Sequence, residues 1–255
     1  QANGTRQLAA WNTGEANTLG VFGSTGTGKT SSVGMMAALR MAMWGWRLTI
    51  LDGKEGSDWD PFDGYSDVIP VNSSNILDAA TVAWDEYKRR VGIMKEFGAR
   101  RYSELPANAQ AEYPRWGLVF EEYGATRDAL DGRRKDELDR IMNTLFQKAR
   151  FTGWHCVVID QRPSLSTPQM KGNLKSIVCF RLAMQQGGAV GAYHADKLAP
   201  RGEFEMDGVH YHSFLAENLV RPALKQIPIL DRPVHAPANQ IVDGEFHERP
   251  VHKPV

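Results

Sequence analysis

One segment near the amino terminus restricts the possible folds more than any other, because it fits the pattern G-x-x-x-x-G-K-[S/T]. The run and the hydroxyl residue after it are Gly23, Ser24, Thr25, Gly26, Thr27, Gly28, Lys29, Thr30 and Ser31. An apolar strand candidate at 19–23 leads into the run, and a helix candidate at 29–43 follows it. This strand–loop–helix order is the context in which such a run cradles phosphate, so the sequence predicts an α/β nucleotide-binding fold.

Each residue type in this run has a chemical reason to be there. The glycines let backbone N–H groups turn toward a β-phosphate that Cβ atoms would obstruct. Lys29 supplies a positive charge to the β and γ oxygens, and the Thr30 hydroxyl is placed to ligate Mg²⁺. The helix that follows directs the positive end of its dipole at the same anion. ATP and Mg²⁺ are therefore the expected ligands of residues 23–31.

Strand and helix candidates alternate along the rest of the chain. Nearly continuous apolar runs predict further strands at 47–52, 67–70, 116–120, 155–159 and 177–184. Apolar residues at helical spacing predict helices at about 75–97, with Ser74 as the N-cap, and at about 138–149. Residues 57–66 and 99–115 are expected to be irregular. Such a pattern is typical of a mostly parallel central sheet with helices on both faces.

The end of the chain differs in composition from the rest. Residues 232–255 hold four prolines and three histidines, which predicts an extended tail. We therefore expect one domain over residues 1–231, followed by the tail.

Two carboxylates, Glu121 and Glu122, follow the strand candidate at 116–120. A phosphate-binding loop needs acidic groups at the tip of another strand. Glu121 would hold the Mg²⁺ water shell, and Glu122 would polarise the attacking water. The usual residue at the first position is aspartate, so the longer Glu121 implies either an adjusted metal position or a different division of roles. The alternative interpretation of both carboxylates is a solvated acidic helix start.

A polar amide, Gln161, ends the next strand candidate, at 155–159. An amide offers both donors and an acceptor, so Gln161 could contact the γ-phosphate and the lytic water together. The alternative is a solvated glutamine at a strand end.

Composition limits the partners and the location. The chain has 30 Lys and Arg against 30 Asp and Glu, which excludes a protein that coats nucleic acid by bulk charge but leaves room for a local basic groove. Cys156 and Cys179 lie in apolar runs and are expected to be buried, reduced thiols. No apolar run approaches the ~20 residues of a membrane helix. We expect a cytoplasmic protein, either free or tethered through regions or partners outside this chain.

Several further segments resemble the FtsK/SpoIIIE family of ring-shaped DNA translocases, within the wider FtsK–HerA group. Residues 147–155 resemble the family's "QKAR..GIH" helix end, and residues 157–164 resemble its "ATQRPS" strand end. Residues 51–56 are similar to the "DPKG" turn, 201–204 to the "GRGDM" element, and 212–214 to the strand after it. These segments occur in the family's order over roughly residues 15–222.

The resemblance implies a RecA-like P-loop NTPase core that assembles as a hexameric ring. ATP would bind between subunits, and double-stranded DNA would pass through the central channel. The resemblance also implies an arginine donated by the neighbouring subunit to the γ-phosphate. Arg181 is the first candidate for this role, with Arg150 and Arg162 as alternatives.

Loops that face the channel would hold DNA through its phosphates. The densest basic cluster is Arg133, Arg134 and Lys135, and Lys171 and Lys175 lie in the loop after Gln161. Contacts of lysine and arginine with phosphate are independent of base sequence and sensitive to salt. The alternative interpretation of the cluster is a solvated, charged helix start with acidic neighbours.

The function expected from the resemblance is ATP-dependent translocation of double-stranded DNA, for DNA transfer, segregation or packaging. One alternative is an FtsK-like ATPase of type VII protein secretion, whose cargo is polypeptide. Another is a nucleotide-binding assembly module with low turnover, which Glu121 in place of aspartate leaves open.

Overall fold

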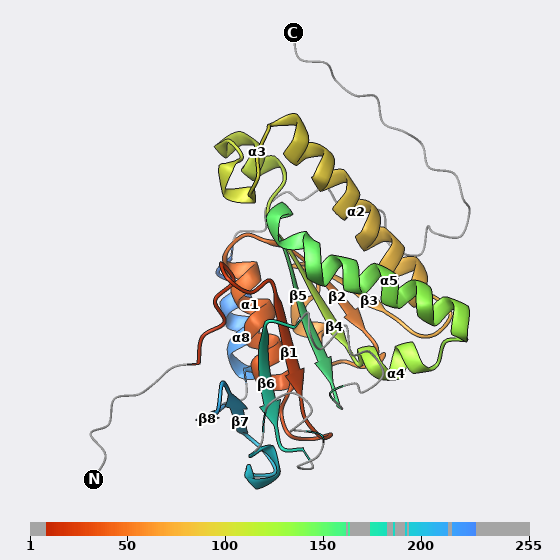
Figure 1. The fold of residues 1–255 in the computed structure, drawn as a ribbon. Helices are drawn as coiled ribbons and strands as arrows, with labels where there is room; N and C mark the ends of the chain where they lie inside the picture. Colours follow the sequence, from red (N-terminus) through yellow and green to blue (C-terminus); the bar gives the residue numbers. More distant parts are fainter. Residues whose placement is uncertain are drawn as a thin grey trace.

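The computed structural model describes residues 9–161, 163, 174–182, 186, 192, 194–213 and 216–227. Within these ranges the chain forms an eight-stranded sheet with the order β3-β2-β4-β5-β1-β6-β7-β8 (Figure 1). The predicted tail at 232–255 lies outside the described residues, as do Arg162 and Lys171.

Six neighbouring strands make up the parallel part of the sheet. In sheet order they are β3 (Asp67–Pro70), β2 (Arg47–Asp52), β4 (Trp116–Glu121), β5 (Trp154–Asp160), β1 (Thr18–Phe22) and β6 (Ser176–Phe180). The strands β7 (Glu203–Met206) and β8 (Val209–His212) continue the sheet beyond β6 in antiparallel pairing. Every residue of β1, β4 and β5 is buried, because these strands are covered on both faces. The predicted mostly parallel sheet is confirmed.

Helices cover both faces of the sheet (Figure 1). On one face lie α1 (Met35–Met43), which follows a π-helical turn at Thr30–Gly34, and α8 (Glu217–Leu224). On the other face lie α2 (Ile76–Glu96) and α5 (Gly132–Lys148). Since side chains alternate along a strand, β5 contributes Val158 to the α2/α5 core and Val157 and Ile159 to the α1/α8 core.

Short helices fill several of the connections. They are η2 (Asp60–Phe62), η3 (Tyr102–Glu104), α3 (Ala107–Glu112), α4 (Tyr123–Asp128), η4 (Ala149–Thr152) and η5 (Ala195–Lys197). The predictions of irregular structure at 57–66 and 99–115 were therefore partly wrong. In the second segment, the Tyr102 hydroxyl donates to the carbonyl oxygens of Gln110 and Tyr113, at 3.1 and 3.0 Å, and this folds the segment on itself. No helix in the described part of the chain is long and apolar enough to cross a membrane.

The predicted cap of α2 was wrong. The helix begins at Ile76, the residue before it is Asn75, and no side chain caps its first turn. The Ser74 hydroxyl instead donates to Asn72 Oδ1 at 2.6 Å, and Asn75 donates to the Pro70 carbonyl at 2.9 Å. These short-range hydrogen bonds close the turn between β3 and α2. The polar side chains are therefore bonded within the turn and do not cap the helix.

Both cysteines are free and buried, as predicted. Burial raises the pKa of the Cys156 thiol well above its usual range and that of Cys179 to about 12. Both thiols therefore stay protonated and pack as small apolar groups in β5 and β6.

His155 in β5 predicts a pH dependence of stability. The side chain is 1% exposed, its ring packs on Trp46 with centroids 4.5 Å apart, and Nε2 lies 3.1 Å from the Thr13 carbonyl oxygen. Burial lowers the pKa of His155 from 6.5 to about 4, so the unfolded chain binds a proton more readily than the folded one. The neutral, buried His155 therefore contributes fully to the free energy of unfolding above pH 6.5. This contribution, about 3 kcal/mol in total, is lost as the pH falls from 6.5 toward 4.

Urea unfolding between pH 7.5 and 4.5 tests this expectation. His155→Gln is expected to flatten the fall in unfolding free energy between pH 6.5 and 4.5. His212→Gln is the control, because that side chain is 86% exposed and should leave the slope unchanged. Parallel curves for the wild type and His155→Gln would contradict a buried, neutral histidine.

Candidate nucleotide-binding site

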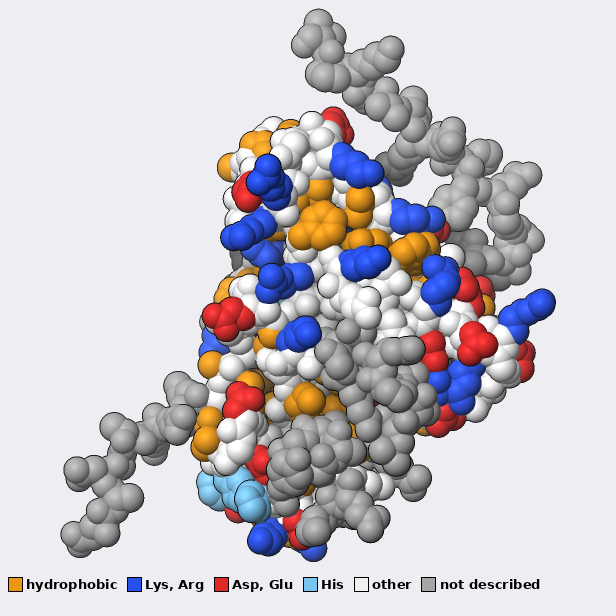
Figure 2. All heavy atoms as spheres, in the orientation of Figure 1, with side chains coloured by type: hydrophobic (Ala, Val, Ile, Leu, Met, Phe, Trp, Pro, Cys, Tyr) orange, Lys and Arg blue, Asp and Glu red, His pale blue; other side chains and the backbone are white. Residues whose placement is uncertain are grey.

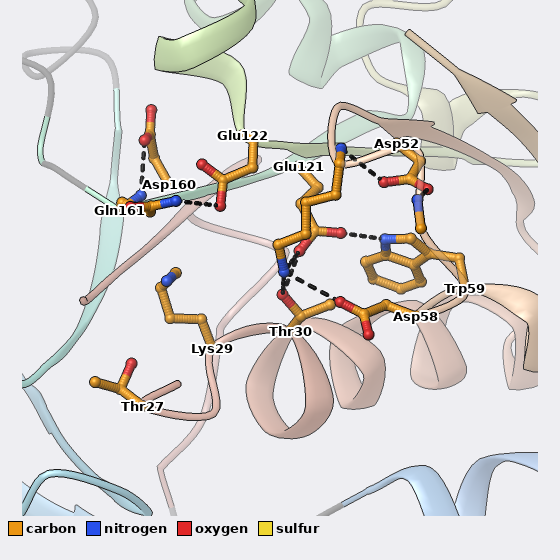
Figure 3. A network of polar contacts seen from close by, with 12 residues as sticks. Thr27, Lys29, Thr30, Asp52, Asp58, Trp59, Glu121, Glu122, Asp160 and Gln161 are labelled. Atoms are coloured by element: carbon orange, nitrogen blue, oxygen red, sulfur yellow. Dashed lines mark hydrogen bonds and ion pairs between the residues drawn. The ribbon is translucent and has the colours of Figure 1, made fainter. Parts of the chain in front are cut away.

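The carboxyl ends of β2, β4, β5 and β1 meet at one edge of the sheet, and polar side chains gather there (Figure 3). Ligands of open α/β sheets bind at this edge. Backbone bonds from Gly23 N to the Asp160 carbonyl (3.3 Å) and from Ser24 N to the Arg181 carbonyl (3.0 Å) hold the start of the glycine-rich run between β5 and β6. The run is thus fixed at the site edge by the sheet itself.

The glycine-rich run forms a compact loop that opens directly into the helical turn at Thr30–Gly34. Gly26 and Gly28 have φ angles of 79° and 101°, in the left-handed region where a side chain would be strained. The Lys29 ammonium donates to the Ser24 carbonyl at 3.1 Å, and the Thr27 hydroxyl donates to the same oxygen at 2.8 Å. Lys29 is buried, and burial lowers its pKa. The loop therefore holds a desolvated cation beside its own backbone.

The two predicted metal ligands, Thr30 and Glu121, are in direct contact. The Thr30 hydroxyl donates a short hydrogen bond to Glu121 Oε1. The Trp59 indole N–H donates to the other oxygen, Oε2, at 2.5 Å. The Lys54 ammonium lies 2.6 Å from Glu121 Oε1 and 3.3 Å from Thr30 Oγ1. A hydroxyl and a carboxylate are the hard oxygen ligands that Mg²⁺ prefers, so this donor pair fits the predicted metal.

The predicted water-activating carboxylate, Glu122, lies beside Gln161 (Figure 3). Gln161 Nε2 donates to Glu122 Oε1 at 3.2 Å, and the Glu122 N–H donates to the Ile159 carbonyl at 2.8 Å. Glu122 has a φ of 55°, a left-handed conformation that is uncommon outside glycine and that clusters at functional sites. The structure thus brings Glu122 and Gln161 together, and their catalytic roles stay predictions.

Sequence reasoning missed several residues at this edge. Asp160 accepts hydrogen bonds from Gln161 N at 2.7 Å and from Gly124 N at 2.6 Å, so it links the end of β5 to the start of α4. Arg201 lines the same pocket as Lys54 and Glu122, and the Gly202 N–H donates to the Thr27 carbonyl at 3.2 Å. The only sequence signal for Arg201 was the family element at 201–204.

The arginines predicted to act across a subunit interface lie in different places. Arg181 is exposed directly after β6, and it lines a pocket with Ser24, Thr25 and Thr27 of its own chain. Arg150 lies in η4, before the amino end of β5, and donates to the Glu15 carbonyl at 2.6 Å. Arg150 is therefore at the far end of the sheet from the loop of its own chain. The role of Arg181 stays a prediction.

The predicted basic cluster forms the first turn of α5. Asp131 caps this helix by accepting from Arg134 N, and the Arg134 guanidinium donates to the Ser74 carbonyl at 3.1 Å. Lys135 forms an ion pair with Asp128 at 2.7 Å. Two of the three basic side chains are thus bound locally, which favours the alternative of a charged helix start.

The other described residue predicted to contact DNA, Lys175, does not join this cluster. It precedes β6 at the amino end of the parallel strands, whereas α5 starts near their carboxyl ends (Figure 1). Lysine and arginine side chains are also spread over the face in Figure 2, with acidic side chains among them. DNA contact by these residues stays a prediction.

The fold and the glycine-rich loop are similar to those of RecA-like P-loop ATPase domains. Sequence comparison finds 29% identity over 196 residues with the DNA translocase FtsK of Mycobacterium tuberculosis H37Rv, covering 66% of this chain and 23% of that protein. This similarity to an FtsK DNA translocase confirms the predicted resemblance, and the chain spans about a quarter of that relative's length. No family model matches the chain.

Solved structures support the fold. The conjugation coupling protein TcpA of pCW3, in a monomer form with ATPγS, superposes with a TM-score of 0.67 at 20% identity, over 82% of this chain and 64% of that one. ATPases 2 and 3 of Thermomonospora curvata EccC, in complex with a signal sequence peptide, give a TM-score of 0.73 at 17% identity, over 93% of this chain and 47% of that one.

Proposed function

We propose that this chain is the motor domain of an ATP-dependent double-stranded DNA translocase. The observation that carries the proposal is the site edge, where Lys29, Thr30, Glu121, Glu122 and Gln161 meet in a chain homologous to FtsK. The resemblance to TcpA, named as a conjugation coupling protein, supports a DNA cargo.

In this proposal, the side chains at the site edge divide the work of hydrolysis. The loop N–H groups and Lys29 bind the phosphates of ATP. Thr30 and Glu121 would hold Mg²⁺, which neutralises charge that develops on the phosphate oxygens. Glu122 accepts a proton from the attacking water, and Gln161 fixes the orientation of the Glu122 carboxylate. The protein's own contribution is positioning and electrostatics, as phosphoryl transfer requires.

The proposal includes assembly into a ring, with six subunits expected from the resemblance. Arg181 would reach the γ-phosphate of a neighbouring subunit, and Arg133 would contact DNA phosphates. Arg133 is exposed on α5, while Arg134 and Lys135 are bound within the chain. The net charge of zero fits a motor that holds DNA only inside a ring, because each subunit then needs to contribute only a few basic loops to the channel.

A second candidate is an FtsK-like ATPase of type VII secretion. The observation in its favour is the superposition on EccC, the structure of which includes a signal sequence peptide. Its cargo would be polypeptide, so the two candidates differ in what stimulates ATP hydrolysis.

Duplex DNA is expected to raise the ATPase rate several-fold at low salt. The concentration of DNA that gives half-maximal stimulation should rise steeply with salt, with a log–log slope of about 0.9 per phosphate contact. The measurement is steady-state ATP turnover with and without duplex DNA over a salt series. A rate that duplex DNA leaves unchanged, and that a signal peptide raises, would replace the first candidate by the second.

Two matched variants locate the DNA contact. Arg133→Gln is expected to weaken stimulation and lower the salt slope, whereas Lys148→Gln, at the other end of α5, should do neither.

Sedimentation with ATP at several protein concentrations tests the ring. A protein that stays monomeric and hydrolyses ATP at its full rate would contradict an arginine supplied by a neighbour.

A further inference from the structure

The Lys54 ammonium contacts both of the predicted metal ligands, Thr30 and Glu121. It lies 2.6 Å from Glu121 Oε1 and 3.3 Å from Thr30 Oγ1, the oxygens assigned to Mg²⁺. Mg²⁺ binds oxygen at about 2.0–2.1 Å. Thr30 and Lys54 already occupy Glu121 Oε1, so a metal that Glu121 holds there, directly or through one of its bound waters, requires Lys54 to move.

The loop after β2 is built to hold Lys54 there. Asp52, at the end of β2, accepts from the Lys54 N–H at 3.0 Å and from the Gly56 N–H at 3.1 Å, which fixes the start of the loop. Further along the same loop, buried Trp59 donates to Glu121 Oε2. Lys54 and Trp59 therefore satisfy both oxygens of the Glu121 carboxylate, one each.

The Glu121 carboxylate needs such partners because it is fully buried. Burial alone would lower the pKa of Lys54, but the hydrogen bond and charge of Glu121, together with Asp58, raise it above its ordinary value. Asp58 Oδ2 lies 3.1 Å from the Lys54 ammonium, and its side chain is 48% exposed. Lys54 thus already pairs with a second anion, which can retain it when it leaves Glu121.

We propose that Lys54 is a built-in counter-ion that stands in for Mg²⁺ at Glu121, and that it leaves Glu121 and keeps only its ion pair with Asp58 when the metal arrives with ATP. This inference rests on the proposed Mg²⁺·ATP site. It makes Lys54 a positioning residue, because it keeps Thr30 and Glu121 in place for the metal. It also makes free Mg²⁺ a weak ligand, since the metal must first displace a bound ammonium and ATP must supply the additional affinity.

Thermal unfolding without nucleotide tests the proposal. Lys54→Met leaves the buried Glu121 charge unpaired, so the midpoint in EDTA is expected to fall by on the order of 10 °C. Millimolar Mg²⁺ alone should restore most of the loss, while the wild-type midpoint should hardly respond. If the midpoint of Lys54→Met falls and Mg²⁺ does not restore it, the Lys54–Glu121 ion pair is purely structural. If Mg²⁺ raises the wild-type midpoint as much as that of Lys54→Met, Lys54 does not compete with the metal.

Two control variants separate competition from general electrostatics. Lys29→Met removes the same charge from the same pocket, but its ammonium donates to the Ser24 carbonyl, so Mg²⁺ rescue is not expected. Lys54→Met combined with Glu121→Gln removes the unpaired charge and should abolish the response to Mg²⁺. A rescue of Lys29→Met equal to that of Lys54→Met would overturn the proposal.

A milder variant keeps the proposal testable if Lys54→Met fails to fold. Asp58→Asn alters an exposed side chain and removes the second partner of Lys54. The Mg²⁺ concentration for half-maximal ATPγS binding is expected to rise several-fold, and an unchanged value would contradict the displacement. If no variant and no wild-type sample binds ATPγS, the proposed function fails, and the nucleotide-free rescue of Lys54→Met still decides the role of Lys54.

Discussion

Glu122→Gln is expected to lower ATP turnover by about 10²–10⁴-fold, the range typical of a lost general base. The amide keeps the shape of the side chain and can still pair with Gln161, so the left-handed backbone at Glu122 should remain in place. ATP binding should change little, because the phosphates contact the loop and Lys29 in the proposed site. The measurements are single-turnover hydrolysis and ATPγS titration on the same sample.

A second variant at the same edge separates the two carboxylates. Glu121→Gln is expected to weaken Mg²⁺-dependent nucleotide binding, because Glu121 contacts Thr30 while Glu122 contacts Gln161. If Glu122→Gln hydrolyses ATP at the wild-type rate and Glu121→Gln does not, the roles are divided differently from the prediction. Loss of binding in both variants would point to a structural role for the pair.

The part of the site predictable from the sequence is the part whose chemistry is local in the chain. The glycine-rich loop is continuous, and nearly unbroken apolar runs predicted β1, β4 and β5. Glu121 and Glu122 directly follow the β4 run, and Gln161 follows Asp160, the last residue of β5. The parallel register pairs Glu121 with Ile159, so the residues just beyond the two strands are neighbours.

The part that could not be predicted depends on the order of strands in the sheet. Lys54 reaches Glu121 because β2 lies next to β4, with Asp52 paired to Glu121 in the register. Apolar runs predict that strands exist, but they do not specify which strands are adjacent. Trp59 likewise bonds a carboxylate 62 positions away, from a segment expected to be irregular.

Local competition for hydrogen bonds explains the remaining differences. Ser74 fits the residue preference of an N-cap, yet its hydroxyl donates to Asn72 inside the preceding turn. The cluster at 133–135 is dense in positive charge, yet neighbouring groups already bind Arg134 and Lys135. Residue composition and positional preference identify side chains that could cap a helix or bind an anion. Which groups these side chains actually contact depends on the folded structure around them.

Lys29→Met is expected to lower ATP affinity by about 10–100-fold, since a charge-assisted hydrogen bond contributes about 1.5–3 kcal/mol. Turnover should fall further, by about 10²–10³-fold, because the ammonium also stabilises charge that develops during transfer. Stability without nucleotide should not fall, because burial disfavours the charge of Lys29, as its lowered pKa reflects. ATPγS should then produce a smaller rise in midpoint than in the wild type.

Calorimetric titration with ATPγS and thermal unfolding with and without it measure both effects. Lys175→Met, which alters an exposed lysine at the opposite end of the strands, is the control and should bind ATPγS normally.

The contrast between Lys29→Met and Lys54→Met matters as much as either result alone. Both lysines lie in one pocket, yet Lys29 contacts a loop carbonyl and Lys54 contacts the buried Glu121 carboxylate. Removing Lys29 should therefore weaken nucleotide binding at little cost in stability, and removing Lys54 should weaken stability in a way that Mg²⁺ repairs. The same phenotype for both variants would mean that the pocket responds to total charge, and the separate roles assigned to the two lysines would be wrong.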